Sequence, residues 1–407
     1  MPATAGVLGA AALAAEVADD LVVGTVRDVH RAISRRVHAP MRAMSRHASV
    51  EERLHDGIAT TVYAGLDLGL RQGARALRAA DRPGVGPRLE EGPAGRFLLA
   101  AVNGLIGDRL RDEVPELFFD IGVRVGGRDV PVNPTDLEAA FPDHTDALVV
   151  FVHGLCENEE AWQRRRRPHN DVTPDEPAPP SYGEALAGRG WTPVHLRINT
   201  GLSLSENGVE VAALLGDLVA AWPGGVRRLV LVGHSLGGLV LRAACAVQTS
   251  GSWTSLVTDV VTLGSPHLGA PLERVVARGT GLMERLPEIA PYSRILEQRS
   301  VGILDLRHGL PPDVESLPHA RYHLVAGSVS RSPRHPVALA IGDLLVQPRS
   351  ALGLPRSGPE MFPGADLLHV PGADHFDLLN HDDVHAALRE WLAPHPMAPD
   401  PAQEAGQ

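Results

Sequence analysis

A serine between two glycines is the residue of this sequence with the clearest chemical potential. Residues 233–237 read GHSLG, the pattern G-x-S-x-G, and they stand between an apolar run at 229–232 and a helical pattern. In that context the serine lies at a sharp, strained strand-to-helix turn that exposes its hydroxyl. Side chains at Gly233 and Gly237 would clash around such a turn. The following helix directs the positive end of its dipole at Ser235, which favours developing negative charge. We therefore predict that Ser235 is a nucleophile.

A second turn supplies what a serine nucleophile needs for acyl transfer. Residues 152–155 read VHGL and end an earlier apolar run. The tetrahedral intermediate of acyl transfer carries an oxyanion, which needs two preorganised N–H donors. We predict that these are the backbone N–H groups of Leu155 and Leu236. Four residues near these turns are predicted to bind the substrate: His153, Gly154, His234 and His267. For His267 a structural role is equally consistent with the pattern.

The serine also needs a general base, and the chain has 19 histidines, so position along the chain must decide. Residues 372–379 read GADHFDLL and lie between the last apolar run and the last helical pattern. In the chain order Ser, acid, His, the base belongs at that place. We therefore predict that His375 is the base. His369 lies inside the run and His381 beyond it, so both are interpreted as structural or surface residues.

An acid must orient the base. Residues 341–346 read IGDLLV and follow an apolar run that ends near Ala326, which makes Asp343 our candidate. Two alternatives remain open. Asp366 lies within the last apolar run, and Asp374 is adjacent to the predicted base. A sequence neighbour points the wrong way to bond the far side of an imidazole, which disfavours Asp374.

The elements that must position these residues alternate between strands and helices. Residues 118–125 and 129–132 are predicted to form a hairpin around the Gly-Gly pair at 126–127. Uninterrupted apolar runs of strand length are typical of parallel strands that are covered on both faces. Six such runs follow, with helical patterns between several of them. This alternation predicts an α/β fold with a mostly parallel, doubly wound sheet. The predicted strands are 147–152, 193–198, 228–232, 257–263, 322–326 and 366–370, and the predicted helices are 209–221, 236–248 and 384–392.

The domain organisation is predicted from changes in these patterns. Residues 1–115 are interpreted as a helical N-terminal region, and 116–394 as the catalytic domain. Within that domain, 270–318 is interpreted as a cap insertion and 164–180 as a polar surface loop. Residues 395–407 are interpreted as a flexible tail.

The helical N-terminal region has apolar residues at helical spacing, with arginines on other faces. Its helices are predicted at 22–37, 51–80 and 94–112. We favour a helical domain that packs on the rest of the chain, because apolar stripes usually face a core. The alternative is an Arg-rich amphipathic anchor on a membrane surface.

Composition excludes several classes of protein. Of the 407 residues, 44% are hydrophobic and 21% charged, which excludes wholesale disorder. A net charge of −11 argues against a nucleic-acid partner, and two cysteines exclude a disulfide scaffold. No metal-ligand cluster or phosphate-binding loop appears, so we expect neither metal nor cofactor. No apolar run is long enough for a transmembrane helix, and the apolar stretch at 5–15 lacks a basic leader. We expect a cytoplasmic protein, with peripheral membrane contact through the N-terminal helices as the alternative.

Several segments together resemble a known family. The chain is similar to α/β-hydrolases of the lipase/esterase group, and in particular to bacterial esterase/lipase proteins with a PGAP1-like (GPI-inositol-deacylase-like) domain. The resemblance covers roughly residues 151–380. It implies an α/β-hydrolase fold with a helical N-terminal extension and a cap insertion, and a catalytic triad of Ser235, Asp343 and His375. The matching segments are FVHGLCENEEAW, LRINTGLSLSENG, LVGHSLGGLV, VTLGSPHLGAPLE, GDLLVQPRSALG and GADHFDLLN.

These observations predict a serine hydrolase that cleaves carboxylic esters through an acyl-enzyme, with an ester or lipid-like substrate. An acyltransferase using the same site is the first alternative, and a catalytically inactive binding module is the second. One segment has a structural interpretation instead. In SENG at 205–208, Asn207 and Glu210 fit a helix N-cap with its capping box. Cys156 and Cys245 are interpreted as packed thiols.

Overall fold

The structure of the protein is a computed structural model, and most of the residues it describes lie between 92 and 392. Several predicted regions lie outside them: the helices at 22–37 and, apart from two residues, 51–80, most of the loop at 164–180, much of the cap at 270–318, and the tail at 395–407. The described residues are 72, 75, 90, 92–113, 115, 117–164, 179–247, 253–270, 300–306, 308–311, 314–330, 343 and 345–392.

An eight-stranded sheet forms the centre of the molecule, in the order β2-β1-β4-β3-β5-β6-β7-β8. β1 pairs antiparallel with β2 and with β4, and all other neighbours are parallel. The predicted mostly parallel sheet is therefore confirmed, with the Gly-Gly hairpin as its antiparallel edge. The strands are β1 Gly122–Val125, β2 Arg128–Val130, β3 Ala147–Val152, β4 Thr192–Arg197, β5 Arg228–His234, β6 Val257–Leu263, β7 Arg321–Ser328 and β8 Asp366–Pro371.

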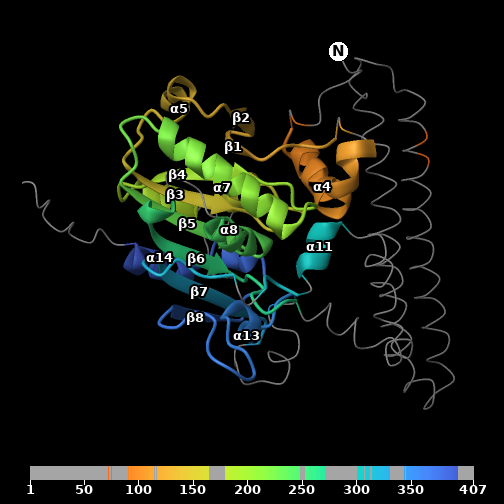
Figure 1. Ribbon diagram of the computed structural model, residues 1–407, viewed down its shortest axis with the longest axis vertical. Coiled ribbons are helices and arrows are strands. Elements are labelled where there is room, and N and C mark those ends of the chain that lie inside the picture. The colour runs from red at the N-terminus through yellow and green to blue at the C-terminus, as the bar shows by residue number, and fades with distance from the viewer. Residues whose placement is uncertain are drawn as a thin grey trace, which may run out of the picture.

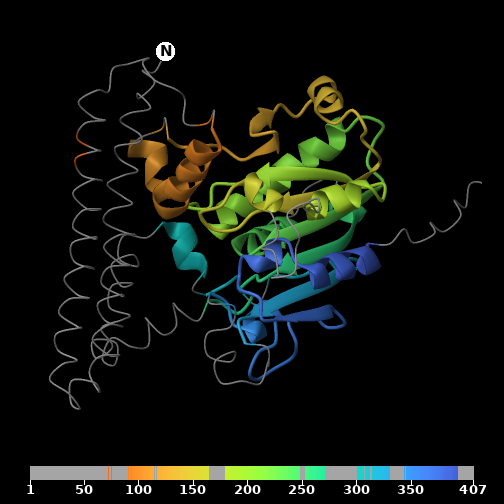
Figure 2. The same cartoon turned by 180° about the vertical axis from the view of Figure 1, so that it is seen from behind.

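Helices cover both faces of the sheet, as Figures 1 and 2 show from opposite sides. α7 (Leu204–Ala221) and α8 (Leu236–Ala246) lie on one face, and α6 (Tyr182–Ala187) and α14 (Asp382–Trp391) on the other. β3 shows why its sequence is apolar throughout. Successive side chains of a strand point to opposite faces, so alternate residues of β3 enter the two cores.

α4 (Pro93–Glu113) stands beside the sheet domain and contacts α11 (Val301–Leu306), as both views show. It coincides with the third predicted N-terminal helix. Backbone angles at Ile106 are non-helical, so the helix is kinked there. The buried Asn103 carboxamide donates to the Leu99 and Leu117 carbonyl oxygens, at 2.9 and 2.7 Å, and accepts from Asn199. α4 is thereby tied to the loop that follows β4.

The start of α7 differs from the prediction. The N-cap is Ser203, whose side chain accepts from the Glu206 amide, and Glu206 reciprocates in a capping box. The pair is four positions upstream of the predicted Asn207 and Glu210. Asn207 is buried instead, and its amide donates to the carbonyl oxygen of Asn199 at 2.9 Å. The sequence contains two overlapping capping patterns, and the helix begins at the earlier one.

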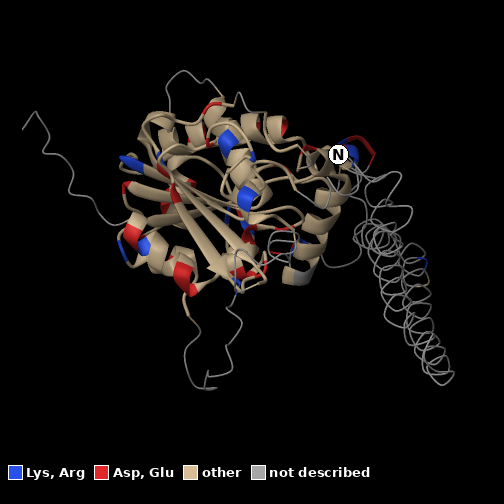
Figure 3. Ribbon diagram, turned by 90° about the horizontal axis from the view of Figure 1, so that it is seen from below, with Lys and Arg blue, Asp and Glu red and all other residues tan. Residues whose placement is uncertain are grey.

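The remaining described elements are short. They are α5 Pro134–Ala140, α13 Pro348–Ala351, and three 3₁₀ turns, η3 Glu159–Gln163, η4 Trp253–Leu256 and η6 Asp377–Leu379. None of the helices in the described part of the chain combines the length and the hydropathy needed to cross a bilayer. Acidic and basic positions are intermixed over the described elements (Figure 3).

Candidate active site

Ser235 lies at the turn between β5 and α8. Its φ of 51° and ψ of −121° are strained for a residue with a side chain. Only one other described non-glycine residue, Cys156, has a positive φ, and it belongs to the loop after β3. The turn is held in place by the Ser235 amide, which donates to the Leu263 carbonyl oxygen of β6 at 2.8 Å. The two strained residues therefore lie in the two turns that the sequence predicts for the site.

The two glycines around Ser235 are explained by close backbone contacts. A Cβ at Gly233 would lie 2.5 Å from the Gly238 Cα, and one at Gly237 would lie 2.4 Å from the Val152 carbonyl oxygen. Neither contact can be relieved by turning a side chain. The first glycine lets the strand meet the helix, and the second lets the helix approach the end of β3. The predicted steric reason for both glycines is confirmed.

His375 and Asp343 form a buried pair beside the serine. His375 Nδ1 lies 2.8 Å from Asp343 Oδ2, and the His375 amide donates to the Asp343 carbonyl oxygen at 3.0 Å. The other carboxylate oxygen of Asp343 accepts from the amides of Leu345 and Val346, at 3.0 and 2.7 Å. The Asp343 carboxylate is therefore held by three contacts. It orients the His375 ring with Nδ1 toward the carboxylate, which leaves Nε2 for proton transfer.

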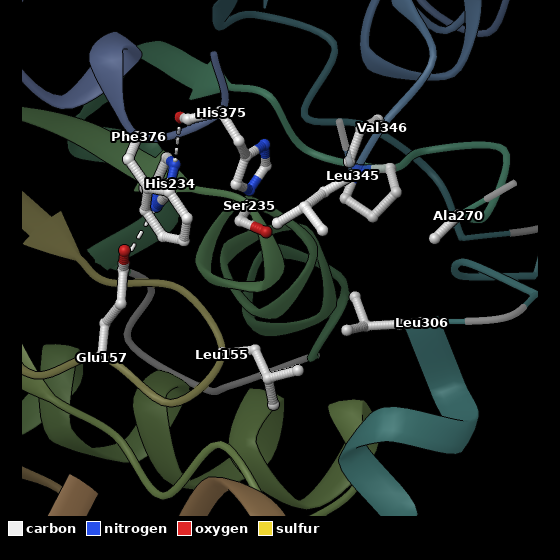
Figure 4. A pocket seen from close by; sticks show the side chains of 11 residues that line it. Leu155, Glu157, His234, Ser235, Ala270, Leu306, Leu345, Val346, His375 and Phe376 are labelled. Carbon is white, nitrogen blue, oxygen red and sulfur yellow. Dashed lines mark hydrogen bonds and ion pairs between the residues drawn. The ribbon is translucent and has the colours of Figure 1, made fainter. Parts of the chain in front are cut away.

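Figure 4 shows the His375 ring above Ser235, with both side chains facing the same cavity. Within the described residues, no hydrogen bond joins the Ser235 hydroxyl to His375. A nucleophile and its base often come into hydrogen-bond contact only in the substrate complex. The structure thus brings Ser235, His375 and Asp343 together from three loops at the carboxyl edge of the sheet, which is where ligands bind in open α/β sheets.

The alternative residues for base and acid lie elsewhere or are engaged elsewhere. Asp366 Oδ2 lies 2.9 Å from His323 Nδ1, at the opposite edge of the sheet. Asp374 Oδ1 accepts from the backbone amides of Phe376 and Asp377, both at 2.9 Å. His369 shares a hydrogen bond with Ser328 at 2.9 Å. His381 caps α14 by accepting from the Asp383 amide at 3.2 Å.

The loop after β3 presents the first predicted oxyanion donor. The Gly154 amide donates to Glu157 Oε2 at 2.8 Å, and the Cys156 amide donates to the Thr200 hydroxyl at 3.1 Å. Within the described residues, the Leu155 amide between them makes no hydrogen bond, and neither does the Leu236 amide at the start of α8. An N–H left without a partner at a site is available to a developing oxyanion. The assignment of Leu155 and Leu236 stays a prediction.

A cavity of about 160 Å³ opens next to Ser235. Its walls are mostly apolar, and Figure 4 shows them facing the serine from the loop after β3, from α11 and from the loop that carries Asp343. Such a lining suits a hydrocarbon chain better than a charged ligand. The lining residues are Leu155, Glu157, His234, Ser235, Pro266, Ala270, Leu306, Leu345, Val346, His375 and Phe376.

The four residues predicted to bind substrate are placed differently from one another. His234 lines the cavity, but its two ring nitrogens face Glu157 and the His375 carbonyl oxygen. The Gly154 backbone amide donates a hydrogen bond to Glu157. His153 is buried, and its Nε2 accepts from the Ile198 amide at 3.1 Å. His267 is also buried. For these two histidines the geometry gives a structural role.

His267 contacts Arg242 of α8 and is not among the residues that line the cavity. Its Nε2 is 3.0 Å from the Thr262 hydroxyl, and its Nδ1 is 3.4 Å from the Arg242 guanidinium. Burial, reinforced by the Arg242 charge, holds the pKa of His267 well below its ordinary value. It is therefore a neutral imidazole. The two cysteines are free thiols, and burial raises the pKa of Cys245 to about 12, which fits a packed thiol.

One residue of the site has no role in our sequence analysis. Glu157 is nine-tenths buried, lines the cavity and joins the loop after β3 to His234. The sequence signal that could have identified Glu157 is its position, three residues after Gly154 of the His-Gly turn. Among the described residues, no group of three or more His, Cys, Asp or Glu side chains is arranged to hold a metal ion.

Comparisons with known proteins give the following likenesses. A family model described as a PGAP1-like alpha/beta domain matches residues 211–289, which include the Ser235 turn. A mature lipase of Bacillus licheniformis is 20% identical, with a TM-score of 0.41, over 67% of this chain and 96% of the lipase. An esterase of Pyrococcus furiosus is 14% identical, with a TM-score of 0.39, over 61% of this chain and 80% of the esterase. An alpha/beta hydrolase fold protein of Chitinophaga pinensis is 14% identical, with a TM-score of 0.38, over 62% and 91%. A search of curated proteins finds no match.

The chain has an α/β-hydrolase fold. The central β5 ends in the serine turn, its parallel neighbours end at the same edge, and the predicted acid and base follow β7 and β8 in chain order. The fold class predicted from the sequence is confirmed, and so is the resemblance to proteins with a PGAP1-like domain.

Proposed function

We propose that the protein is a serine hydrolase that cleaves carboxylic esters through an acyl-enzyme. The observation that carries the proposal is the buried His375–Asp343 pair, 2.8 Å apart, facing one cavity with a serine held at a positive φ. A histidine fixed at Nδ1 by a carboxylate presents Nε2 as a base. A serine on a strained turn has its hydroxyl exposed to a substrate.

The reaction follows from these roles. Ser235 Oγ attacks the ester carbonyl carbon while its proton passes to His375 Nε2, and the carbonyl oxygen becomes an oxyanion near the Leu155 and Leu236 amides. The intermediate collapses, the alcohol leaves with the proton from His375, and an acyl-serine remains. Water then attacks the acyl carbon and gives its proton to His375. The acid leaves, and the serine recovers its hydrogen.

The cavity supports a substrate with an apolar acyl group. Leucine, valine, alanine and proline side chains make up most of its wall. Each methylene of a chain that is fully transferred from water to such a wall contributes ~0.8 kcal/mol. We therefore propose esters with acyl chains longer than acetyl as the substrate class.

An active-site-directed probe tests the proposal directly. A fluorophosphonate should label the native chain at Ser235 and add one phosphonyl group by intact mass. The Ser235→Ala variant should not react, and neither should the wild type after heat unfolding. Hydrolysis of p-nitrophenyl butyrate should be lost in parallel. A native chain that is folded but neither labelled nor able to hydrolyse the ester would refute the proposal.

A further inference from the structure

A second buried carboxylate–histidine pair stands beside the nucleophile, and the mechanism above does not use it. Glu157 Oε2 lies 2.9 Å from His234 Nδ1 and accepts from the Gly154 amide at 2.8 Å. His234 Nε2 lies 3.1 Å from the carbonyl oxygen of His375. Figure 4 shows this chain of contacts crossing the site from Glu157 to the loop of His375. The pair therefore joins the loop after β3, the nucleophile turn and the base loop.

The acceptors around His234 define its protonation. A carbonyl oxygen can only accept, so the contact with His375 requires a proton on His234 Nε2. The Glu157 carboxylate accepts as well, so Nδ1 also carries a proton. Burial lowers the pKa of His234, but the Glu157 charge offsets it and the pKa is raised overall. Burial raises the pKa of Glu157, but the His234 charge lowers it to about 2. The contacts of the two His234 nitrogens, together with the directions of both pKa shifts, fit an imidazolium paired with a carboxylate.

The pair is buried and close to the chemistry, with His234 fully buried and Glu157 nine-tenths buried at the cavity. The His234 and His375 ring centroids are 4.7 Å apart. His234 is directly before Ser235 in the chain, so its ring orientation and the nucleophile's backbone are coupled. In the interior, charge interactions at such distances are stronger than in water. The groups that face His234 are Glu157, His375 and Asp343 as charged or titratable side chains, and Trp162 and Phe376 as aromatic ones.

We propose that Glu157 and His234 are positioning residues that hold the loop after β3, the Ser235 turn and the loop of His375 as one unit. The inference rests on the proposed esterase function. Glu157 fixes Gly154 next to the predicted oxyanion donor Leu155, and His234 fixes the backbone of His375. The cationic end of the pair lies toward Ser235 and His375, where it favours the negative charge of the transition state.

Two substitutions separate the charge from the connection. Glu157 Oε2 accepts both from the Gly154 amide and from His234 Nδ1. In Glu157→Gln the amide oxygen can take the place of Oε2 and keep both contacts, whereas the carboxylate charge that stabilises the imidazolium is lost and His234 becomes neutral. We expect kcat to fall about 10-fold with little change in KM. In His234→Asn the shorter side chain does not reach the His375 carbonyl oxygen, so this connection is cut, and we expect kcat to fall by roughly 100-fold. The double variant should be no slower than His234→Asn, because the two residues act as a unit.

The pH profile is the readout that a purely structural role would not move. The His234 and His375 ring centroids are 4.7 Å apart. An imidazole gains a proton more readily when a neighbouring cation is removed, so in Glu157→Gln the acidic limb of the kcat/KM profile should move to higher pH. Glu159→Gln is the matched control. Glu159 is a buried carboxylate two residues away that pairs with Arg124 at 2.9 Å and does not line the cavity, so its loss should leave the profile unchanged.

The outcomes are distinguishable. Fluorophosphonate labelling of the wild type tests the proposed function itself, and its failure would refute that function before the variants matter. With labelling established, the expected kcat losses and the shifted limb in Glu157→Gln support the pair. The proposal is overturned if Glu157→Gln keeps kcat within twofold and an unchanged pH profile. It is also overturned if the activity loss only follows the folded fraction, measured by circular dichroism on the same samples.

Discussion

Two buried histidine–aspartate pairs lie at opposite edges of the same sheet. His375 and Asp343 follow β8 and β7 at the carboxyl edge, 2.8 Å apart. His323 and Asp259 lie near the starts of β7 and β6, with Nε2 and Oδ1 2.9 Å apart. Both histidines are almost inaccessible to solvent. The pairs therefore match in chemistry, distance and burial, and these properties alone do not identify a catalytic pair.

The difference lies in what surrounds each pair. At the amino edge, the Trp391 ring of α14 stacks on His323 with centroids 4.6 Å apart, and Arg321 lies 2.7 Å from Asp259 Oδ1. At the carboxyl edge, a serine and an apolar cavity stand next to the imidazole. A covered pair that does not line a cavity contributes to stability, whereas a pair with an imidazole nitrogen toward a cavity is available for proton transfer. The comparison predicts that mutations at the carboxyl edge change turnover and that mutations at the amino edge change the stability of the fold.

Asp343→Asn should have the largest effect on turnover. The amide oxygen can keep the bonds from the Leu345 and Val346 amides, so the fold should survive. The amide nitrogen would face His375 Nδ1 and force the wrong tautomer, so kcat should fall by ~10⁴-fold. Asp366→Asn is the control, because Asp366 contacts His323 instead, and it should keep kcat within twofold. Ester hydrolysis and thermal unfolding of both variants check this. The assignment fails if Asp366→Asn is the inactive one.

The sequence predicts much of this site because the chemistry is local to the turns. The Ser235 turn, its two glycines and the loops after β7 and β8 each follow from short patterns. The partner of Asp366 could not be predicted, because its contact with His323 depends on which strands are neighbours in the sheet. The role of Glu157 was missed for the same reason, since His234 is 77 residues away in the chain. Periodicity predicts strands but does not give their order.

Asp259→Asn should have the largest effect on stability. The substitution removes a buried carboxylate that His323 Nε2 and Arg321 both contact. Losing hydrogen bonds to a buried charged group should lower the free energy of unfolding by roughly 3 kcal/mol. Turnover of the folded fraction should be unchanged. Urea unfolding at neutral pH gives the first quantity and kcat at low temperature the second. If kcat falls while the free energy of unfolding is unchanged, the amino edge contributes to turnover and our distinction between the two edges is wrong.

The same substitution has a defined pH dependence. Burial raises the pKa of Asp259, but hydrogen bonds and the Arg321 charge more than offset it and hold the pKa below its ordinary value of 3.8. A carboxyl whose pKa is lower in the folded state contributes stability above its unfolded value and loses it as pH falls further. The stability difference between wild type and Asp259→Asn should therefore be full at neutral pH and narrow below about pH 4. A difference that is constant from pH 7 to pH 2 would contradict this account.

The two edges also contact different helices. The C-terminal residue of α14, Trp391, lies on His323 at the amino edge, and α4 meets the loop after β3 at the carboxyl edge. A Cβ at Gly104 of α4 would lie 2.6 Å from Cys156 Sγ and 2.9 Å from its backbone nitrogen. Gly104→Ala should therefore move the loop that carries Leu155 and lower kcat by about 10-fold to 100-fold. Gly216→Ala in α7 is the control, because its nearest contact would be an ordinary 3.7 Å. That variant should keep its activity and gain up to ~1 kcal/mol of helix stability. Equal activity in both variants would show that α4 does not brace the site.

The smallest expected effect concerns the cavity, which makes the carboxyl edge a binding edge. Leu345 lines this cavity with 38% of its surface exposed, and Leu304 on α11 is 40% exposed but does not line it. Both should tolerate truncation to alanine. In Leu345→Ala an acyl chain loses part of an apolar wall, and at ~0.8 kcal/mol per methylene left unburied, kcat/KM should fall several-fold for an octanoate ester. The acetate ester is too short to reach that wall and should be unaffected, as should every ester with Leu304→Ala.

The measurement is kcat/KM on p-nitrophenyl esters from acetate to dodecanoate. An equal loss on acetate and octanoate would mean that Leu345 acts through the neighbouring Asp343 rather than through the acyl chain, because only the Asp343 contact is common to both substrates.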